Sequence, residues 1–248
     1  MNPASPLIIA LDNMSTEQIQ TLCEWLIAPV TLKVNDLLFQ EGLKGISDLR
    51  RLLTSAEYEW MLDPKFKDIW NTVGNYLQRL YDSDMRDATS LLTLHASWGT
   101  EMIKNAVKKR DLLQLKTRLL AITVLTTMTE SDCREIHGWD INTTVLRLAR
   151  FAKNNGVDGA VCAPKEAEML RNEMGEDFLI VTPNVRLPGQ VVENDDQNPD
   201  RSRTPKEAFD LGASHIVVGR PITKAEHPPA VINLIMEDVM TSRLNTWK

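Results

Sequence analysis

Eight short apolar runs, each ending in polar residues, alternate with amphipathic segments along this chain of 248 residues. Such runs are typical of buried strands, and their alternation with helix-like segments is typical of βα units in a parallel sheet. Eight βα units in about 250 residues match the size of a (β/α)8 TIM barrel, an α/β fold. The runs lie at residues 6–12, 30–35, 58–66, 90–97, 119–126, 159–163, 178–185 and 214–219.

The segments between the runs support a single domain over residues 1–248. Ser15 and Gln18 have the spacing of a capping box, which predicts a helix over residues 15–27. A last helix is expected over about residues 229–243. No Gly/Ser-rich linker interrupts the series.

The longest loop candidate covers residues 187–203 and is rich in Asn, Asp, Gly and Pro. A loop this long inside a compact domain is usually functional. In a barrel it follows the seventh strand, on the side where active sites lie. We therefore expect a mobile loop that closes over a ligand.

The charge and cysteine content exclude several kinds of partner. The net charge is −6 and the basic residues are scattered, which argues against nucleic acid or an anionic membrane as the main partner. The three cysteines are widely spaced and form no C-x-x-C pair, which argues against a zinc or redox site. No apolar stretch is long enough to span a bilayer. We therefore expect a cytoplasmic protein.

Charged residues stand at the carboxyl end of the third run. Asp63 and Lys65 are two residues apart, so in a strand they point to the same face. Pro64 cannot donate to a strand ladder, which predicts that the pair lies at the strand's exit. Asp68 falls in the following loop.

Two further charges, Asp12 and Lys33, end the first and second runs. For any one of these charges, a solvated side chain or a structural ion pair is the ordinary explanation. Five charges at the carboxyl ends of three consecutive strands favour a functional site, because barrel active sites lie there.

The segment from Asp63 to Asp68, D-P-K-F-K-D, resembles the D-x-K-x-x-D signature of the orotidine 5′-phosphate decarboxylase family. Other segments resemble the family's motifs, in the same order and over nearly the whole chain: Ala10-Leu-Asp12, Lys33-Val34, Leu94-His95-Ala-Ser97, Val124-Leu-Thr126, Thr182-Pro-x-x-Arg186 and Val218-Gly219-Arg220-Pro221.

The resemblance implies cofactor-free decarboxylation of orotidine 5′-monophosphate to uridine 5′-monophosphate and CO2, a step of de novo pyrimidine biosynthesis. It makes Lys65 the proton donor at C6 and places Asp63 near the substrate carboxylate. Lys33 and Asp68 would complete a Lys-Asp-Lys-Asp array that keeps Lys65 protonated and oriented. No cofactor and no metal are implied.

The resemblance also implies a homodimer in which Asp68 and Thr72 reach across the interface into the partner subunit's site. Asp12 and Lys33 become candidates for binding the ribose hydroxyls. Thr126 becomes a candidate for positioning the nucleotide.

The phosphate group would be bound by Gly219 and Arg220 after the eighth strand and by Arg186 after the seventh. Gln197, which follows an aspartate as in the family's D-Q segment, would bridge phosphate and pyrimidine, with Gln190 as the alternative. The long loop would then close over the phosphate.

Two other functions remain open. Magnesium-dependent sugar-phosphate decarboxylases and aldolases of the same superfamily share D-x-K-x-x-D, but they place an acidic metal ligand where this chain has Lys33. A lysine at that position would repel a divalent cation. The other alternative is a barrel that binds a nucleotide without turning it over.

Five positions depart from the family's pattern, among them Lys67, which replaces a usual histidine. Asn35 and Asn184 stand where the family usually has glycine, and asparagine enters left-handed backbone conformations more readily than most residues. Trp98 replaces a usual glycine, and Trp70 replaces a usual proline in the loop that would cross the dimer.

Overall fold

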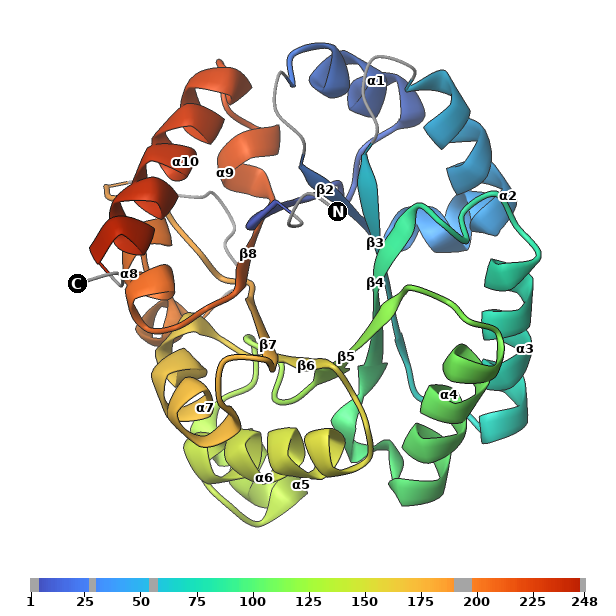
Figure 1. The fold of residues 1–248 in the computed structure, drawn as a ribbon. Coiled ribbons are helices and arrows are strands. Elements are labelled where there is room, and N and C mark those ends of the chain that lie inside the picture. Colours follow the sequence, from blue (N-terminus) through green and yellow to red (C-terminus); the bar gives the residue numbers. More distant parts are fainter. Residues whose placement is uncertain (1–4, 27–29, 54–57, 190–197, 246–248) are drawn as a thin grey trace.

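Eight parallel strands pair in chain order and close into a barrel surrounded by helices (Figure 1). The computed structural model describes residues 5–26, 30–53, 58–189 and 198–245. The predicted single-domain (β/α)8 barrel is confirmed. The strands are β1 (Leu7–Ala10), β2 (Thr31–Val34), β3 (Glu59–Phe66), β4 (Thr89–His95), β5 (Arg118–Ile122), β6 (Gly159–Val161), β7 (Leu179–Thr182) and β8 (His215–Val218).

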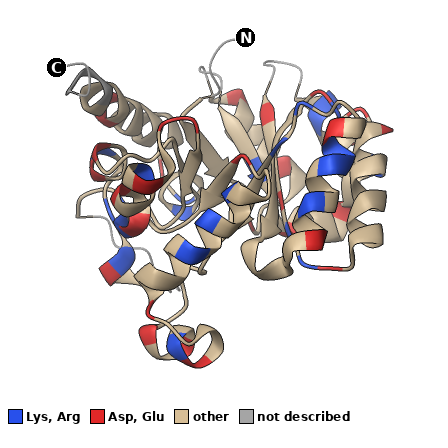
Figure 2. Ribbon diagram, turned by 60° about the horizontal axis from the view of Figure 1, so that its bottom comes forward, with Lys and Arg blue, Asp and Glu red and all other residues tan. Residues whose placement is uncertain are grey.

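The helices cover the outside of the barrel, and Figure 2 shows positive and negative residues interspersed along them. Among the described residues, no helix is long and apolar enough to cross a membrane. The helices are α1 (Thr16–Glu24), α2 (Asp36–Leu52), α3 (Trp70–Tyr81), α4 (Thr100–Leu112), α5 (Glu130–His137), α6 (Ile141–Asn154), α7 (Ala167–Met174), α8 (Pro205–Asp210), α9 (Arg220–Thr223) and α10 (Pro228–Asn245), with 3-10 turns η1 (Ala96–Trp98), η2 (Pro164–Glu166) and η3 (Pro199–Arg201).

The capping box predicted at the start of α1 is present. The Ser15 side chain accepts a hydrogen bond from the Gln18 backbone N–H, and the Gln18 side chain accepts one from the Ser15 N–H. The helix ends at Glu24, three residues before the predicted boundary.

The strands alternate between an interior layer and an outer layer that packs against the helices. Inward-facing apolar side chains form a separate buried cluster: Ile8, Ala10, Met61, Leu91, Leu120, Ile122, Val161, Leu179, Val181 and Val217. Because alternate residues share a face, Asp63 continues the inward face of Met61. The fold therefore directs a charged residue into the carboxyl end of the barrel.

A β-bulge interrupts β3 at the charged pair. Residue Leu62 pairs with Leu92, but the next registered pair is Phe66 with Leu94, so β3 advances four residues against two of β4. Pro64 therefore lies within β3, inside a bulge, and not at the strand's exit as predicted. A bulge tolerates proline because no ladder hydrogen bond is lost there.

Gly159 in β6 is required by close packing inside the barrel. A Cβ at this position would lie 2.5 Å from Leu179 Cβ and 2.6 Å from the Leu179 carbonyl oxygen. We expect Gly159→Ala to lower the free energy of unfolding by about 1–3 kcal/mol, because the backbone must shift. Urea denaturation measures this change.

The control for this experiment is Gly74→Ala in α3, where an added Cβ meets no described atom within 4 Å. Alanine in a helix should leave the stability unchanged or raise it by up to about 1 kcal/mol. Equal stability of the Gly159→Ala variant and the wild type would contradict the packing argument.

Candidate active site

A cavity of about 550 Å³ lies at the carboxyl ends of the strands, within the usual size range of small-molecule sites. Its position follows from the barrel, whose loops after each strand gather at this end. The cavity is lined by eight of the residues predicted from sequence: Asp12, Lys33, Asp63, Lys65, Thr126, Arg186, Gly219 and Arg220.

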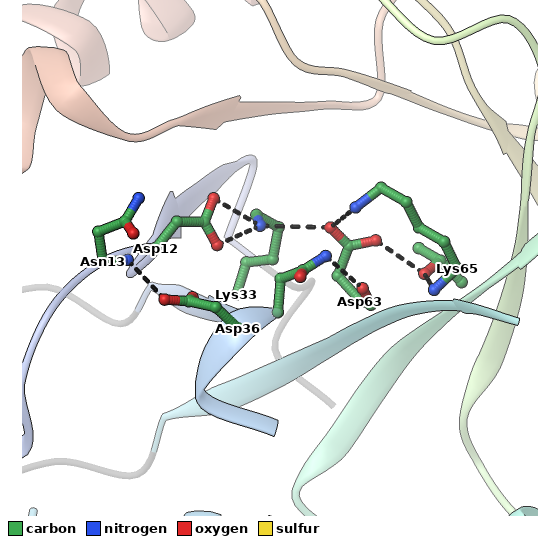
Figure 3. A network of polar contacts seen from close by, with 8 residues as sticks. Asp12, Asn13, Lys33, Asp36, Asp63 and Lys65 are labelled. Carbon is green, nitrogen blue, oxygen red and sulfur yellow. Dashed lines mark hydrogen bonds and ion pairs between the residues drawn. The ribbon is translucent and has the colours of Figure 1, made fainter. Parts of the chain in front are cut away.

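Four of these side chains form a continuous chain of alternating charge (Figure 3). Lys33 Nζ lies 2.8 Å from Asp12 Oδ1 and 3.2 Å from Asp63 Oδ2. Lys65 Nζ lies 2.7 Å from the same Asp63 oxygen. The order in space is therefore Asp12, Lys33, Asp63, Lys65.

Burial and ion pairing act against each other at the centre of this array. Burial alone would lower the pKa of Lys33, but the charges of Asp63 and Asp12 outweigh it, and the pKa is raised. Burial alone would raise the pKa of the Asp63 carboxyl, but Lys33 and Lys65 outweigh it, and this pKa is lowered. Both groups are therefore ionised at neutral pH.

The turn after β1 is held by α2. The Asn13 N–H donates to Asp36 Oδ2 at 2.9 Å, and Asn13 adopts a left-handed φ of 58° (Figure 3). The first residue of α2 thus fixes the residue that follows Asp12. Asp12 itself is paired with the Lys33 ammonium at 2.8 Å.

Two uncharged side chains that the sequence analysis did not assign to the site contact Asp63. Thr93 Oγ1 donates to Asp63 Oδ1 at 2.7 Å, and Asn35 Nδ2 donates to the Asp63 carbonyl at 2.8 Å. Neither residue carries a charge that would draw attention in a strand. The signal that could have found Thr93 is its position on β4, two residues beyond the inward-facing Leu91.

The cavity is strongly cationic. Besides Lys33 and Lys65 it is lined by Arg186, Arg220 and Lys224, so among its described lining residues five are basic and two, Asp12 and Asp63, are acidic. The sequence analysis did not assign Lys224 to the site, although this residue lies four positions after Arg220, at the end of the short helix α9. This balance suits an anionic ligand, in a protein whose net charge is −6.

The two asparagines that replace family glycines behave differently. Asn184 has a φ of 66°, so it occupies the left-handed region, and its Nδ2 donates to the Asn198 carbonyl at 2.9 Å. Asn35 has a φ of −126°, so left-handed tolerance is the wrong explanation for that residue. Its amide instead contacts the Asp63 backbone.

Among the described residues, Asp68 and Thr72 do not line the cavity. Asp68 is exposed; its Oδ1 accepts the Ile69 N–H at 2.7 Å, and its carbonyl accepts the indole N–H of Trp98. Thr72 lies in the first turn of α3 and is half-buried. The structure thus leaves these two residues outside the array of their own chain.

The predicted loop at residues 187–203 is described only in part. Gln190 and Gln197 both lie outside the described residues. The end of the loop is anchored, because Arg201 is buried, pairs with Glu166 at 3.0 Å and donates to the Leu125 carbonyl at 2.8 Å. Its mobility stays a prediction.

Within the part of the chain that the structure describes, no three His, Cys, Asp or Glu side chains gather as a metal site would require. The acidic groups of the array, Asp12 and Asp63, are both paired with Lys33.

Comparison with known proteins assigns the family. The profile of the orotidine 5′-phosphate decarboxylase / HUMPS family matches residues 5–235. The chain is 37% identical over 233 residues to an orotidine 5′-phosphate decarboxylase of Staphylococcus saprophyticus and 39% identical over 235 residues to that of Staphylococcus haemolyticus, covering 93% of this chain and 96% of each relative.

Solved structures agree with this assignment. A crystal structure of orotidine 5′-phosphate decarboxylase from Lactobacillus acidophilus superimposes with a TM-score of 0.77 at 34% identity, covering 94% of this chain and 98% of that one. An uncharacterized conserved protein from Geobacillus kaustophilus gives a TM-score of 0.75 at 27% identity, covering 94% and 99%.

The fold and the site define a barrel enzyme whose cationic cavity suits an anionic small molecule. The chain belongs to the orotidine 5′-phosphate decarboxylase / HUMPS family. The prediction of an enzyme of this family, made from its motifs, is confirmed.

Replacing Asp63 tests the electrostatics of the array. At neutral pH, Asp63→Asn leaves Lys33 and Lys65 without the carboxylate between them, so we expect a lower free energy of unfolding. Because the pKa of Asp63 is lowered in the folded state, the unfolded state binds more protons between the folded value and 3.8, and stability rises with pH there.

The difference in free energy of unfolding between wild type and Asp63→Asn should therefore be constant above about pH 5 and narrow below it. Urea denaturation between about pH 7 and pH 3 measures it, with Asp87→Asn, at an exposed site, as the control. A difference that persists undiminished at the acid end would show that the stabilisation does not come from an ionised Asp63.

Proposed function

We propose that this protein decarboxylates orotidine 5′-monophosphate to uridine 5′-monophosphate and CO2 without a metal ion, in de novo pyrimidine biosynthesis. The observation that carries the proposal is the chain of alternating charge from Asp12 to Lys65, at the edge of a cationic cavity. Relatives 37% and 39% identical bear the name of this enzyme.

The reaction breaks the bond between C6 and the carboxylate, and the electron pair stays on C6 as CO2 leaves. Lys65 is suited to stabilise that charge and then donate a proton to C6, because its ammonium borders the cavity and is oriented by Asp63 at 2.7 Å. Charges fixed in a water-poor site act more strongly than in bulk water. Solvent returns the proton to Lys65 after product release.

Asp63 is suited to act on the leaving group. Its carboxylate is buried and ionised, and it borders the cavity beside Lys65. A substrate carboxylate placed near it would be repelled, which favours loss of CO2. Lys33, bound to Asp63 at 3.2 Å, keeps that negative charge in place.

The remaining lining residues suit the rest of the nucleotide. We assign the phosphate to Arg186, Arg220 and the backbone at Gly219, where a helix begins. Asp12 and Lys33 are assigned to the ribose hydroxyls. Thr126, which lines the cavity after β5, is assigned to positioning the nucleotide, and Gln197 to a bridge between phosphate and pyrimidine.

Asp68 and Thr72 are assigned to the site of a partner subunit in a homodimer. Asp68 is exposed next to Ile69 and Trp70, whose exposed fractions are 62% and 53%. Large apolar side chains exposed together mark an interaction surface. A partner seated here would receive Asp68 as the fourth member of its array.

The main alternative is a magnesium-dependent reaction on a sugar phosphate. Lys33 argues against it, because its ammonium already lies between the carboxylates of Asp12 and Asp63. A divalent cation at that place would meet a like charge. The other alternative is a barrel that binds a nucleotide without turning it over. Nucleotide binding alone does not require an ammonium such as that of Lys65 paired with a buried carboxylate such as that of Asp63.

Removing the proposed proton donor should abolish turnover. We expect Lys65→Ala to form no measurable uridine 5′-monophosphate, while wild type and the exposed control Lys116→Ala are active in the presence of excess EDTA. Product formation is followed spectroscopically. Near-normal kcat in Lys65→Ala would refute the role of Lys65, and loss of wild-type activity with EDTA would refute the metal-free reaction.

Mixed dimers test the shared site. In a heterodimer of Lys65→Ala and Asp68→Ala subunits, one site has both defects and the other has none. Random mixing of these inactive variants should restore about a quarter of wild-type activity. The control mixes Lys65→Ala with Lys65→Ala,Asp68→Ala subunits, which can form no intact site. Verified heterodimers without activity would count against the exchange of Asp68.

A further inference from the structure

One hydroxyl group joins Asp63 and Lys65, the last two residues of the chain of alternating charge. Thr93 Oγ1 donates to Asp63 Oδ1 at 2.7 Å and accepts the backbone N–H of Lys65 at 3.0 Å. Thr93 is fully buried, and it is not among the described residues that line the cavity. It therefore acts on Asp63 and Lys65 without access to the substrate.

Asn35 holds the same bulge from the opposite side. Its Nδ2 donates to the Asp63 carbonyl at 2.8 Å, from the end of β2. Asn35 makes no side-chain capping hydrogen bond to α2, so its amide is committed to the bulge. Asp63 is thus fixed by its carboxylate from β4 and by its carbonyl from β2.

The bulge needs this support because its backbone is unusual. Pro64 has no N–H to donate, and the pairing of β3 with β4 is interrupted between Leu62 and Phe66. Lys65 has a φ of 48°, a left-handed conformation that is unfavourable for a residue with a side chain. Such conformations persist only where surrounding contacts determine them.

We propose that Thr93 and Asn35 are positioning residues that hold Asp63 and Lys65 in the geometry needed for decarboxylation. The inference rests on the proposed function and adds two residues that act through the array. Proton transfer and charge stabilisation depend steeply on distance, and a displacement of about 1 Å can cost about 100-fold in rate.

The first test is Thr93→Val, which keeps the shape of the side chain and removes the hydroxyl. We expect kcat to fall by about 10- to 100-fold. KM should change much less, because Thr93 does not border the cavity among the described residues. Thr93→Ser, which keeps the hydroxyl, should recover most of the lost kcat.

Thr89→Val is the matched control on the same strand. Thr89 is buried, and its Oγ1 has no hydrogen-bond partner in the part of the chain that the structure describes. The same substitution there removes a hydroxyl from β4 without touching the array. We expect wild-type kcat for this variant.

The pH profile separates positioning from general damage. Against the effect of burial, the Thr93 hydroxyl helps Lys33 and Lys65 to lower the pKa of Asp63. Its loss should raise that pKa, so the acid limb of kcat moves to higher pH in Thr93→Val. Thr89→Val should show no such movement. Circular dichroism at each pH measures the folded fraction of each variant, so that kcat is corrected for any loss of folded protein, which is itself greater at acid pH.

Asn35→Ala tests the other contact at a half-buried position. Its control is Gln40→Ala, at an exposed position in α2, the helix that begins directly after Asn35. We expect kcat to fall several-fold, with KM changed less and Gln40→Ala unaffected. If Thr93→Val does not fold, Asn35→Ala decides the inference, and wild-type kcat there overturns it.

The outcomes distinguish this inference from the function on which it rests. Wild-type turnover together with undiminished kcat in both Thr93→Val and Asn35→Ala overturns the positioning role alone. Absence of any wild-type turnover overturns the proposed function and the positioning role together.

Discussion

The ion pair between Lys33 and Asp63 is the interaction on which the site depends. Both side chains are almost fully buried, and each would be costly to bury alone. Asp12 on one side and Lys65 on the other extend the pair into a chain in which each charge has an opposite neighbour. This arrangement keeps the Lys33 ammonium and the Asp63 carboxylate ionised side by side. Burial would disfavour the charge of either group without the other.

The barrel supplies the geometry for this chain of charge. Period-two alternation brings Asp63 to the inward face of β3, and parallel pairing in register sets Lys33 of β2 opposite Met61, two residues before Asp63. Residues at the carboxyl ends of neighbouring strands then meet in one cavity. The cationic residues Arg186, Arg220 and Lys224 border the same cavity from later in the chain, so one end of the fold gathers charges from distant segments.

Much of the site could be predicted because charge in a buried strand is conspicuous. Asp12, Lys33, Asp63 and Lys65 each end an apolar run, and the motifs around them resemble one family in order. Thr93 could not be recognised in this way, because a threonine is ordinary in a strand and its value lies in which atoms surround it. The bulge was also missed: Pro64 was expected at the strand's exit, whereas the strand continues through it to Phe66.

The sequence by itself determined the eight βα units, the face on which Asp63 lies and the family, because these follow from local periodicity and from residue types in order. Only the tertiary structure decided how Asp63 and Lys65 meet. Their backbone is held by Thr93 from β4 and Asn35 from β2. Strand periodicity predicts to which face of its own strand a side chain points. A bulge is instead fixed by hydrogen bonds from neighbouring strands, and these form only once the barrel has closed.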